Sequence, residues 1–282
     1  MKKFILLVSF ITFYFASAFA QQSNSDGILK VLAIGNSFSQ DAIETYLHEL
    51  VEADNRQIII GNMYIGGAPV ERHVKNANEN AKAYAYRKIN LEGVRKEIKN
   101  VSLEEALKDE KWDYISLQQA SPLSGKYDVI MKDLPQLIDY VKSLAPHAKL
   151  VYHQTWAYQQ NFDDKKFANY DHSQKKMYES IADATKRINK NKSFTFVIPA
   201  GTAIQNARTS SLGDTYTRDG YHLELNYGRF TAACAWYQKL FNTDVRKNPY
   251  KPEKVSDLQS KVAKEAAYKA VKKPFKVSKV KL

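Results

Sequence analysis

The sequence has little cysteine, glycine and proline, and it has no long apolar run beyond its first twenty residues. The single Cys234 excludes an internal disulfide framework and a cysteine-ligated zinc cluster, because both need several thiols. Only 11 Gly and 8 Pro occur in 282 residues, which excludes a collagen-like or low-complexity chain. What is present instead is 44% hydrophobic residues, enough for a packed core. Cys234 lies between small residues and Trp236, so we expect it to be a buried helix residue.

The first twenty residues have the pattern of a secretory signal peptide. A short positive segment, residues 1–3, precedes a nearly unbroken apolar run over residues 4–15, and Ala18-Phe19-Ala20 supplies the small residues of a cleavage site. A retained N-terminal anchor is the alternative, but the run is too short to span a bilayer comfortably. We therefore predict cleavage before Gln21 and export of the mature protein to a periplasm or beyond the cell.

Short apolar runs alternate with segments of helical periodicity along the rest of the chain. The runs predict strands at residues 29–34, 57–63, 114–117, 149–153 and 194–198, and the periodic segments predict helices at 41–51, 68–87, 129–144, 173–189 and 227–241. Such alternation is typical of right-handed crossovers between parallel strands. We therefore expect a three-layer α/β/α sandwich whose site lies beyond the carboxyl ends of the strands.

The formal net charge of +12 is unevenly distributed. Residues 246–282 hold 12 Lys+Arg against three Asp+Glu, whereas residues 21–245 hold 28 against 27. The sequence thus divides into the signal peptide 1–20, a near-neutral domain 21–245 and a basic C-terminal tail 246–282. Within the tail, 255–271 has a helical pattern. The last eleven residues alternate Lys with apolar residues, as in an edge strand or a flexible end.

The basic tail does not by itself indicate a nucleic-acid-binding protein. Its charge is not arrayed around an aromatic surface that could read bases, and export separates the protein from most nucleic acid. The tail is either a solvated segment or makes weak contact with anionic surfaces such as an acidic glycan.

Two of the loops at the predicted carboxyl edge contain residues suited to nucleophilic catalysis. Ser37 lies at the turn from the first strand into the first helix, where unpaired N–H groups favour negative charge. Asp219 precedes His222 by three residues, a spacing that lets a carboxylate orient an imidazole. The structural alternatives are a helix N-cap at Ser37 and an ordinary turn at Asp219–His222.

Together these residues resemble the SGNH, or GDSL-type, serine hydrolase superfamily. The resemblance rests on Gly35-Asn36-Ser37, the pair Gly66-Gly67, an amide after the third strand and Asp219-x-x-His222, and it extends over residues 29–241. It implies a flavodoxin-like, five-stranded parallel sheet of order 2-1-3-4-5 and an esterase mechanism that uses no metal or other cofactor. It also implies that Ser37 is the nucleophile, His222 the general base and then acid, and Asp219 the orienting carboxylate.

The resemblance further implies an oxyanion hole. Its first two donors are the backbone N–H groups of Ser37 and Gly67. Most members place an Asn side chain after the third strand as a third donor, but this chain has Ala120 at that position. Some carbohydrate-esterase branches use a Gln in this loop, so Gln118 or Gln119 is the candidate. Strand alternation sends the two side chains to opposite faces, and Gln118 is slightly favoured.

Aromatic and amide side chains near these loops suit a sugar, because sugar rings pack on aromatics while their hydroxyls bond amides. The candidate substrate-binding residues are Asn36, His153, Gln154, Trp156 and Tyr221, although a position at the edge of the core is equally consistent with His153. No metal-ligand spacing is recognisable among the remaining His and Asp residues.

The sequence therefore predicts an exported serine esterase that removes acetyl or similar ester groups from a carbohydrate or another small acylated substrate. Two alternatives remain at this point. The first is a non-catalytic or weakly active glycan-binding protein on the same fold, motivated by the missing Asn. The second is a lipid or thioester acylhydrolase.

Overall fold

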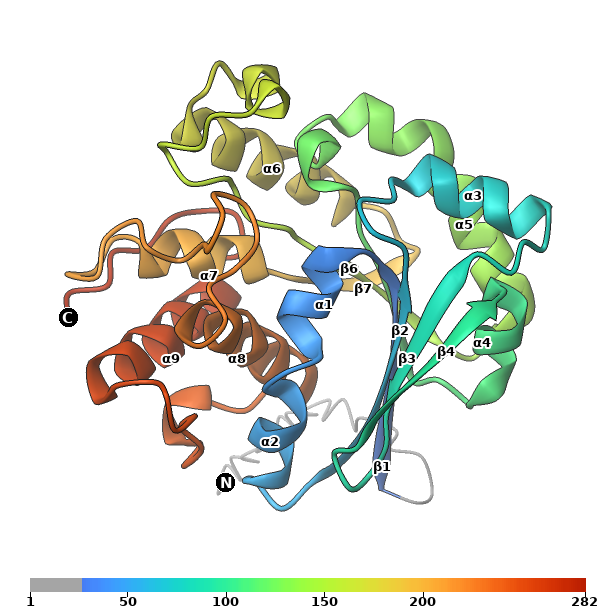
Figure 1. The fold of residues 1–282 in the computed structure, drawn as a ribbon, viewed down its shortest axis with the longest axis horizontal. Coiled ribbons are helices and arrows are strands. Elements are labelled where there is room, and N and C mark those ends of the chain that lie inside the picture. Colours follow the sequence, from blue (N-terminus) through green and yellow to red (C-terminus); the bar gives the residue numbers. More distant parts are fainter. Residues whose placement is uncertain (1–26) are drawn as a thin grey trace, which may run out of the picture.

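Strand β1 (Ile28–Gly35) shows how the apolar runs build the centre of the molecule. Val31 and Ala33 point into one hydrophobic cluster, while Leu32 and Ile34 point into the other, and all four are fully buried. A strand covered on both faces needs an unbroken apolar run rather than an alternating one. The sheet therefore lies between two layers of helices (Figure 1).

The computed structural model describes residues 27–282, so the predicted signal peptide, residues 1–20, lies outside the described residues. The remaining strands are β2 (Gln57–Tyr64), β3 (Tyr84–Ile89), β4 (Arg95–Val101), β5 (Tyr114–Leu117), β6 (Lys149–His153) and β7 (Phe194–Ile198). The α-helices are α1 (Ser37–Ile43), α2 (Leu47–Glu52), α3 (Val70–Asn78), α4 (Leu103–Asp109), α5 (Tyr127–Leu144), α6 (Gln174–Ile188), α7 (Ala200–Ala207), α8 (Tyr227–Phe241) and α9 (Asp257–Lys272). Short 3₁₀ segments are η1 (Ser121–Leu123), η2 (Lys165–Tyr170) and η3 (Val245–Lys247).

The sheet has the strand order β4-β3-β2-β1-β5-β6-β7. The five strands β2-β1-β5-β6-β7 pair in parallel, and counted along the chain they have the predicted order 2-1-3-4-5. The prediction of five strands is wrong, because β3 and β4 add an antiparallel hairpin next to β2. The α/β sandwich itself is confirmed.

The sequence pattern does not reveal this hairpin, because part of β3 falls within the predicted helix 68–87 and β4 has no apolar run. The predicted helix 68–87 ends at Asn78, and Asn80 has a left-handed φ of 43°. Tyr84 and Tyr86 then alternate with more exposed residues, as in a half-buried strand. In β4 every residue before Val101 is exposed, so hydrophobicity gives no strand signal.

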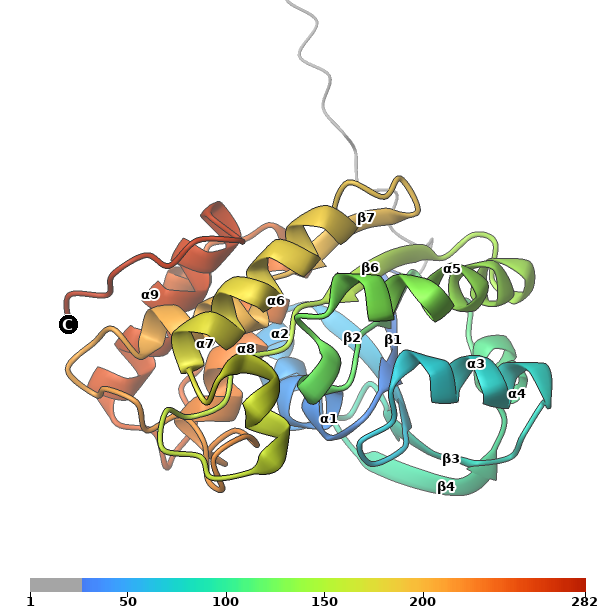
Figure 2. The same cartoon turned by 90° about the horizontal axis from the view of Figure 1, so that it is seen from above.

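The helices divide between the two faces of the sheet. Helices α3, α4 and α5 cover one face, and α1, α2 and α8 cover the other, as Figures 1 and 2 show from two directions. Helix α9 lies outside α7 and α8, against which it makes most of its contacts. Its residues Val262, Ala263, Ala266, Ala267 and Ala270 are fully buried.

The boundary that the sequence placed at residue 245 does not separate two packed units. Residues 246–282 contain the expected helix, but its apolar face, together with Val255 and Val280, belongs to the same hydrophobic cluster as α8. Residues 273–282 form no strand. In residues 27–282, no helix combines the length and apolar character that crossing a membrane requires.

Candidate active site

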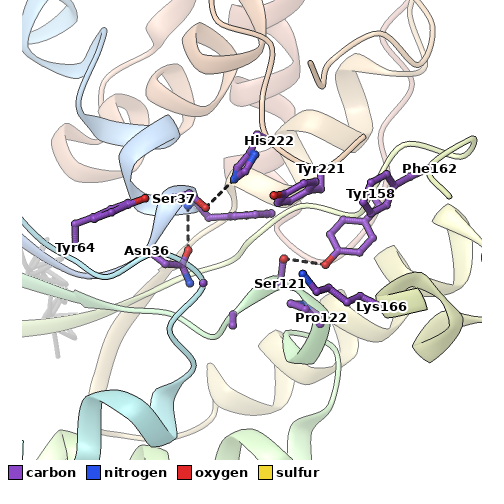
Figure 3. Close-up of a pocket in the computed structure, with 14 residues that line it drawn as sticks. Asn36, Ser37, Tyr64, Ser121, Pro122, Tyr158, Phe162, Lys166, Tyr221 and His222 are labelled. Carbon is purple, nitrogen blue, oxygen red and sulfur yellow. Dashed lines mark hydrogen bonds between the residues drawn. The ribbon is translucent and has the colours of Figure 1, made fainter. Parts of the chain in front are cut away.

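A cavity of about 330 Å³ opens at the carboxyl ends of the parallel strands, where the topology places the site. Figure 3 shows its side chains converging from loops that follow β1, β2, β5 and β6 and from the segment before α8. Its lining consists of Asn36, Ser37, Phe38, Tyr64, Gly66, Gly67, Ala120, Ser121, Pro122, Tyr158, Phe162, Lys166, Tyr221 and His222.

Ser37 is the first residue of α1, and Asn36 is its N-cap. The Asn36 side chain accepts a hydrogen bond from the Phe38 N–H at 3.0 Å, which fixes the turn that presents the Ser37 hydroxyl. Its amide nitrogen also donates to the carbonyl of Ala68 at 3.1 Å, so Asn36 joins the β1 and β2 loops. Asn36 lines the cavity as predicted, but most of its polar capacity is used within the protein.

The structure brings Ser37, His222 and Asp219 together. His222 Nε2 lies 2.9 Å from Ser37 Oγ, and His222 Nδ1 lies 2.6 Å from Asp219 Oδ2 (Figure 3 shows the first contact). An Nδ1–H donated to the carboxylate leaves Nε2 as the acceptor that faces the serine hydroxyl. This is the arrangement that acyl transfer through a serine requires.

Asp219 is held ionised by its neighbours. Partial burial opposes ionisation, but hydrogen bonds from the His222 ring and from the N–H groups of His222 and Tyr221 outweigh it and lower the pKa of Asp219. Between the two residues, Gly220 has a φ of +91°, and a Cβ at this position would collide with the ring of Phe162. Glycine is therefore required at this point of the turn.

Asp41, which the sequence analysis did not single out, anchors this turn to α1. Its carboxylate is 1% exposed and accepts from the Leu223 N–H at 2.9 Å. It also pairs with Arg229 at 2.7 Å and Arg218 at 3.1 Å. Because Asp41 lies one helical turn after Ser37, it ties the helix that begins at Ser37 to the segment that carries His222. An acid among the apolar residues of a predicted helix was the available signal.

The two predicted backbone donors lie at the same cavity as the Ser37 hydroxyl. Gly67 has a φ of +66°, at a turn closed by the hydrogen bond from the Ala68 N–H to the Ile65 carbonyl. Within the part of the chain that the structure describes, the N–H groups of Ser37 and Gly67 have no acceptor. Both are therefore available to a developing oxyanion.

Neither glutamine supplies the predicted third donor, which is a correction to that prediction. Gln118 donates its amide to Asn36 Oδ1 and accepts from His153 Nδ1, each at 2.9 Å. Gln119 folds back so that its oxygen accepts from the N–H groups of Val70 and Ala120. Both side chains are 2% exposed and neither lines the cavity. Their longer stems let them bond the surrounding loops instead of reaching the substrate space.

Three of the predicted substrate-binding residues are buried beneath the site, so that prediction is wrong for them. His153 is fully buried, which lowers the pKa of its ring to about 3, and it contacts Gln118. Gln154 is also fully buried and accepts from the Thr202 N–H. Trp156 stacks on Phe38 and donates to the Tyr221 carbonyl at 2.7 Å. Only Asn36 and Tyr221 of the five line the cavity.

Several cavity residues are not among the substrate-binding candidates that the sequence predicts. Tyr64 is the last residue of β2, Ser121 and Pro122 open η1, and the Tyr158 hydroxyl lies 2.9 Å from the Ser121 hydroxyl. Phe162 and Lys166 come from the loop and 3₁₀ segment after β6, which Figure 3 shows opposite Ser37. Their signal was the aromatic-rich loop itself, but no spacing distinguished the lining residues from the buried ones.

No group of three or more His, Cys, Asp or Glu side chains within residues 27–282 is arranged to hold a metal ion. The arrangement around Ser37 contains the parts that acyl transfer uses: a hydroxyl, an oriented imidazole, a carboxylate and two N–H donors that have no acceptor among residues 27–282.

Comparison with known proteins gives a family and a fold. The family model described as "Domain of unknown function (DUF4886)" matches residues 30–270. A crystal structure of a DUF4886 family protein from Bacteroides uniformis ATCC 8492 is 52% identical, with a TM-score of 0.88 over 90% of this chain and 98% of the other. A putative GDSL-like lipase from Parabacteroides merdae ATCC 43184 is 14% identical, with a TM-score of 0.50 over 76% of this chain and 96% of the other, which shows a shared fold. No curated protein matches the sequence.

Proposed function

Since this chain belongs to the DUF4886 family, whose description assigns no activity, we propose a function from the geometry of its cavity: an exported serine esterase of the SGNH type that removes acetyl or similar groups from a carbohydrate. The observation that carries the proposal is the contact between Ser37 Oγ and His222 Nε2 at 2.9 Å, in the cavity that Gly67 also lines. The fold shared with a GDSL-like lipase is consistent with it.

In this proposal Ser37 Oγ attacks the ester carbonyl carbon while its proton passes to His222 Nε2. The carbonyl oxygen becomes negative and accepts hydrogen bonds from the Ser37 and Gly67 N–H groups. Collapse of this intermediate expels the sugar alcohol, which takes the proton from His222 and leaves an acyl group on Ser37. Water, deprotonated by His222, then releases the acid and restores the serine. Asp219 stabilises the imidazolium at both stages.

The cavity supports a small acyl group on a polar, ring-shaped alcohol. Tyr64, Tyr158, Phe162 and Tyr221 provide aromatic surface, while Lys166 and the tyrosine hydroxyls provide hydrogen-bond donors for sugar oxygens. A volume of about 330 Å³ lies at the small end of ligand pockets, which favours a short acyl chain over a long lipid.

Purified mature protein tests the proposal. We expect it to hydrolyse p-nitrophenyl acetate and to be labelled by a fluorophosphonate, and Ser37→Ala should abolish both. The control is Ser211→Ala, an exposed serine outside the cavity, which should leave both unchanged. Turnover that survives Ser37→Ala contradicts the proposal. A screen of acetylated glycans for released acetate then identifies the substrate.

A second candidate is a weakly active or non-catalytic glycan-binding protein, which the positions of Gln118 and Gln119 favour. With two oxyanion donors instead of three, turnover is expected to be lower, since one donor typically contributes on the order of 10²–10³ in rate. Fluorophosphonate labelling of Ser37 would exclude the non-catalytic form, because labelling needs an activated serine. The rate of p-nitrophenyl acetate hydrolysis then separates a weakly active protein from an efficient esterase.

A further inference from the structure

A second cavity, of about 490 Å³, lies among α9, η3 and the segment that follows α9. It shares no lining residue with the cavity at Ser37. Its one acidic side chain is Glu265. Six cationic side chains also line it: Arg246, Lys261, Lys264, Lys269, Lys279 and Lys281. We call this the basic cavity.

Three of the cations are held in place by the protein. Arg246 pairs with Glu265 at 3.3 Å, and Lys269 pairs with the same carboxylate at 3.1 Å. Lys264 donates to the Asn248 carbonyl at 2.7 Å. These contacts fix the walls of the basic cavity and use its one acidic side chain completely.

The other three cations form no close ion pair within the described residues, although Lys261 acts on Asp257 at longer range. Lys261, Lys279 and Lys281 are exposed, and no carboxylate lies within ion-pair distance of them in the described part of the chain. Like charges gathered around a hollow repel one another and concentrate anions from solution. Partial burial also lowers the pKa of Lys264, in keeping with a cation whose water has been partly removed. A bound anion would relieve this repulsion.

The shape and chemistry of the basic cavity select among anionic ligands. A concave site can enclose a single anionic group or a segment of a polymer, whereas a flat membrane surface could not enter it. No aromatic side chain lines the cavity, so nucleic-acid bases would have nothing to stack on. Lysine ammonium groups act as point charges that suit single carboxylate or sulfate groups.

We propose that the basic cavity binds an acidic glycan through its carboxylate or sulfate groups. The site is separate from the cavity at Ser37 and does not depend on the proposed esterase activity. It gives the cationic residues 246–282 a defined place on the folded protein rather than a general attraction to anionic surfaces.

Binding of carboxylated and sulfated oligosaccharides to the full mature chain tests this proposal, by calorimetry with oligogalacturonate and chondroitin sulfate fragments. Neutral dextran, single-stranded DNA and phosphatidylserine vesicles serve as comparisons. We expect binding of at least one acidic oligosaccharide, weakened by salt and absent for dextran. Equal or tighter binding of the DNA or the vesicles overturns the choice of ligand, and no binding of either oligosaccharide overturns the site.

A matched pair of variants separates the basic cavity from net charge. The first replaces Lys261, Lys279 and Lys281 with Gln, and the second replaces Lys254, Lys273 and Lys276, which are exposed and lie outside the cavity. Both remove three charges. The first should weaken oligosaccharide binding roughly tenfold, as three modest ion pairs would, and the second should change it less than twofold. Equal losses in both overturn the proposal, and circular dichroism checks that both variants fold.

Discussion

At the residue scale, we expect Asp41 to position His222 for the proposed reaction. Its buried carboxylate joins α1 to the Leu223 N–H and to two arginines. Asp41→Asn keeps the side-chain shape but leaves Arg229 without its partner. We expect kcat on p-nitrophenyl acetate to fall far more than KM changes, and the free energy of unfolding to fall by about 3 kcal/mol.

The control for Asp41 is Glu52→Gln, which removes an exposed acid from α2 and should alter neither quantity. Asp41→Glu, which restores the charge with a longer stem, should recover part of the stability. A variant Asp41→Asn with wild-type kcat would show that the turn keeps its position without this anchor.

A second residue-scale prediction concerns the pH dependence of the Asp219–His222 contact. The folded-state pKa of Asp219 is lowered despite partial burial, because His222 and two backbone N–H groups bond the carboxylate. Such a group stabilises the fold above the unfolded-state pKa of about 4. This contribution is lost as the pH falls through the lower folded-state value.

Asp219→Asn should therefore reduce Tm slightly at pH 7, and the difference from the wild type should shrink toward zero as the pH approaches 2. The same variant should lower kcat by roughly 10³–10⁴, because an amide no longer selects the Nδ1–H tautomer. A difference in Tm that grows on acidification would contradict the assigned sign.

At the scale of helices and strands, sequence periodicity predicted the parts of the fold that are buried on both faces. The boundaries of β5, β6, β7 and α8 agree with the predicted segments. The hairpin β3–β4 escaped because β4 is a charged edge strand, fixed by pairing with β3 and by ion pairs such as Arg95–Glu44. The Arg95–Glu44 ion pair joins residues 51 positions apart, which a local sequence pattern does not contain.

The same distinction explains the outcome at the candidate site. Ser37 and Gly67 lie in short motifs after β1 and β2, and Asp219 and His222 lie in a short motif before α8, and the sequence singles them out through these motifs. The roles of Gln118 and His153 could not be predicted in this way, since the Gln118 amide and the His153 ring face inward and form a hydrogen bond with each other. Whether a polar side chain at a strand end points into a cavity or beneath it depends on the side-chain packing of several loops.

Helix α9 gives a prediction at the element scale. Five of its small and branched residues are fully buried against α7 and α8, and burying Val262 alone is worth about 1.5–3 kcal/mol. Truncation after Val245 should therefore yield protein without cooperative thermal unfolding. Lys272→Gln, an exposed change at the end of α9, is the control and should unfold as the wild type does. A soluble, cooperatively folded truncation would show that α9 is dispensable.

At the scale of the whole molecule, Cys234 reports on global stability, because it is the one thiol in the chain and lies in α8 beneath α9. Its side chain has 0% accessible surface in the folded state, so neither solvent nor reagent reaches it. Burial also raises the pKa of the thiol well above its usual range. A thiol reagent such as Ellman's can react only after the helices around Cys234 separate.

We expect no labelling over minutes in native buffer and complete labelling in denaturant. The labelling rate across a urea series should follow the unfolding transition measured by circular dichroism, and Cys234→Ala should remove the signal while leaving that transition within about 1 kcal/mol. Rapid, stoichiometric labelling of the native protein would mean that α8 and α9 open independently of the sheet.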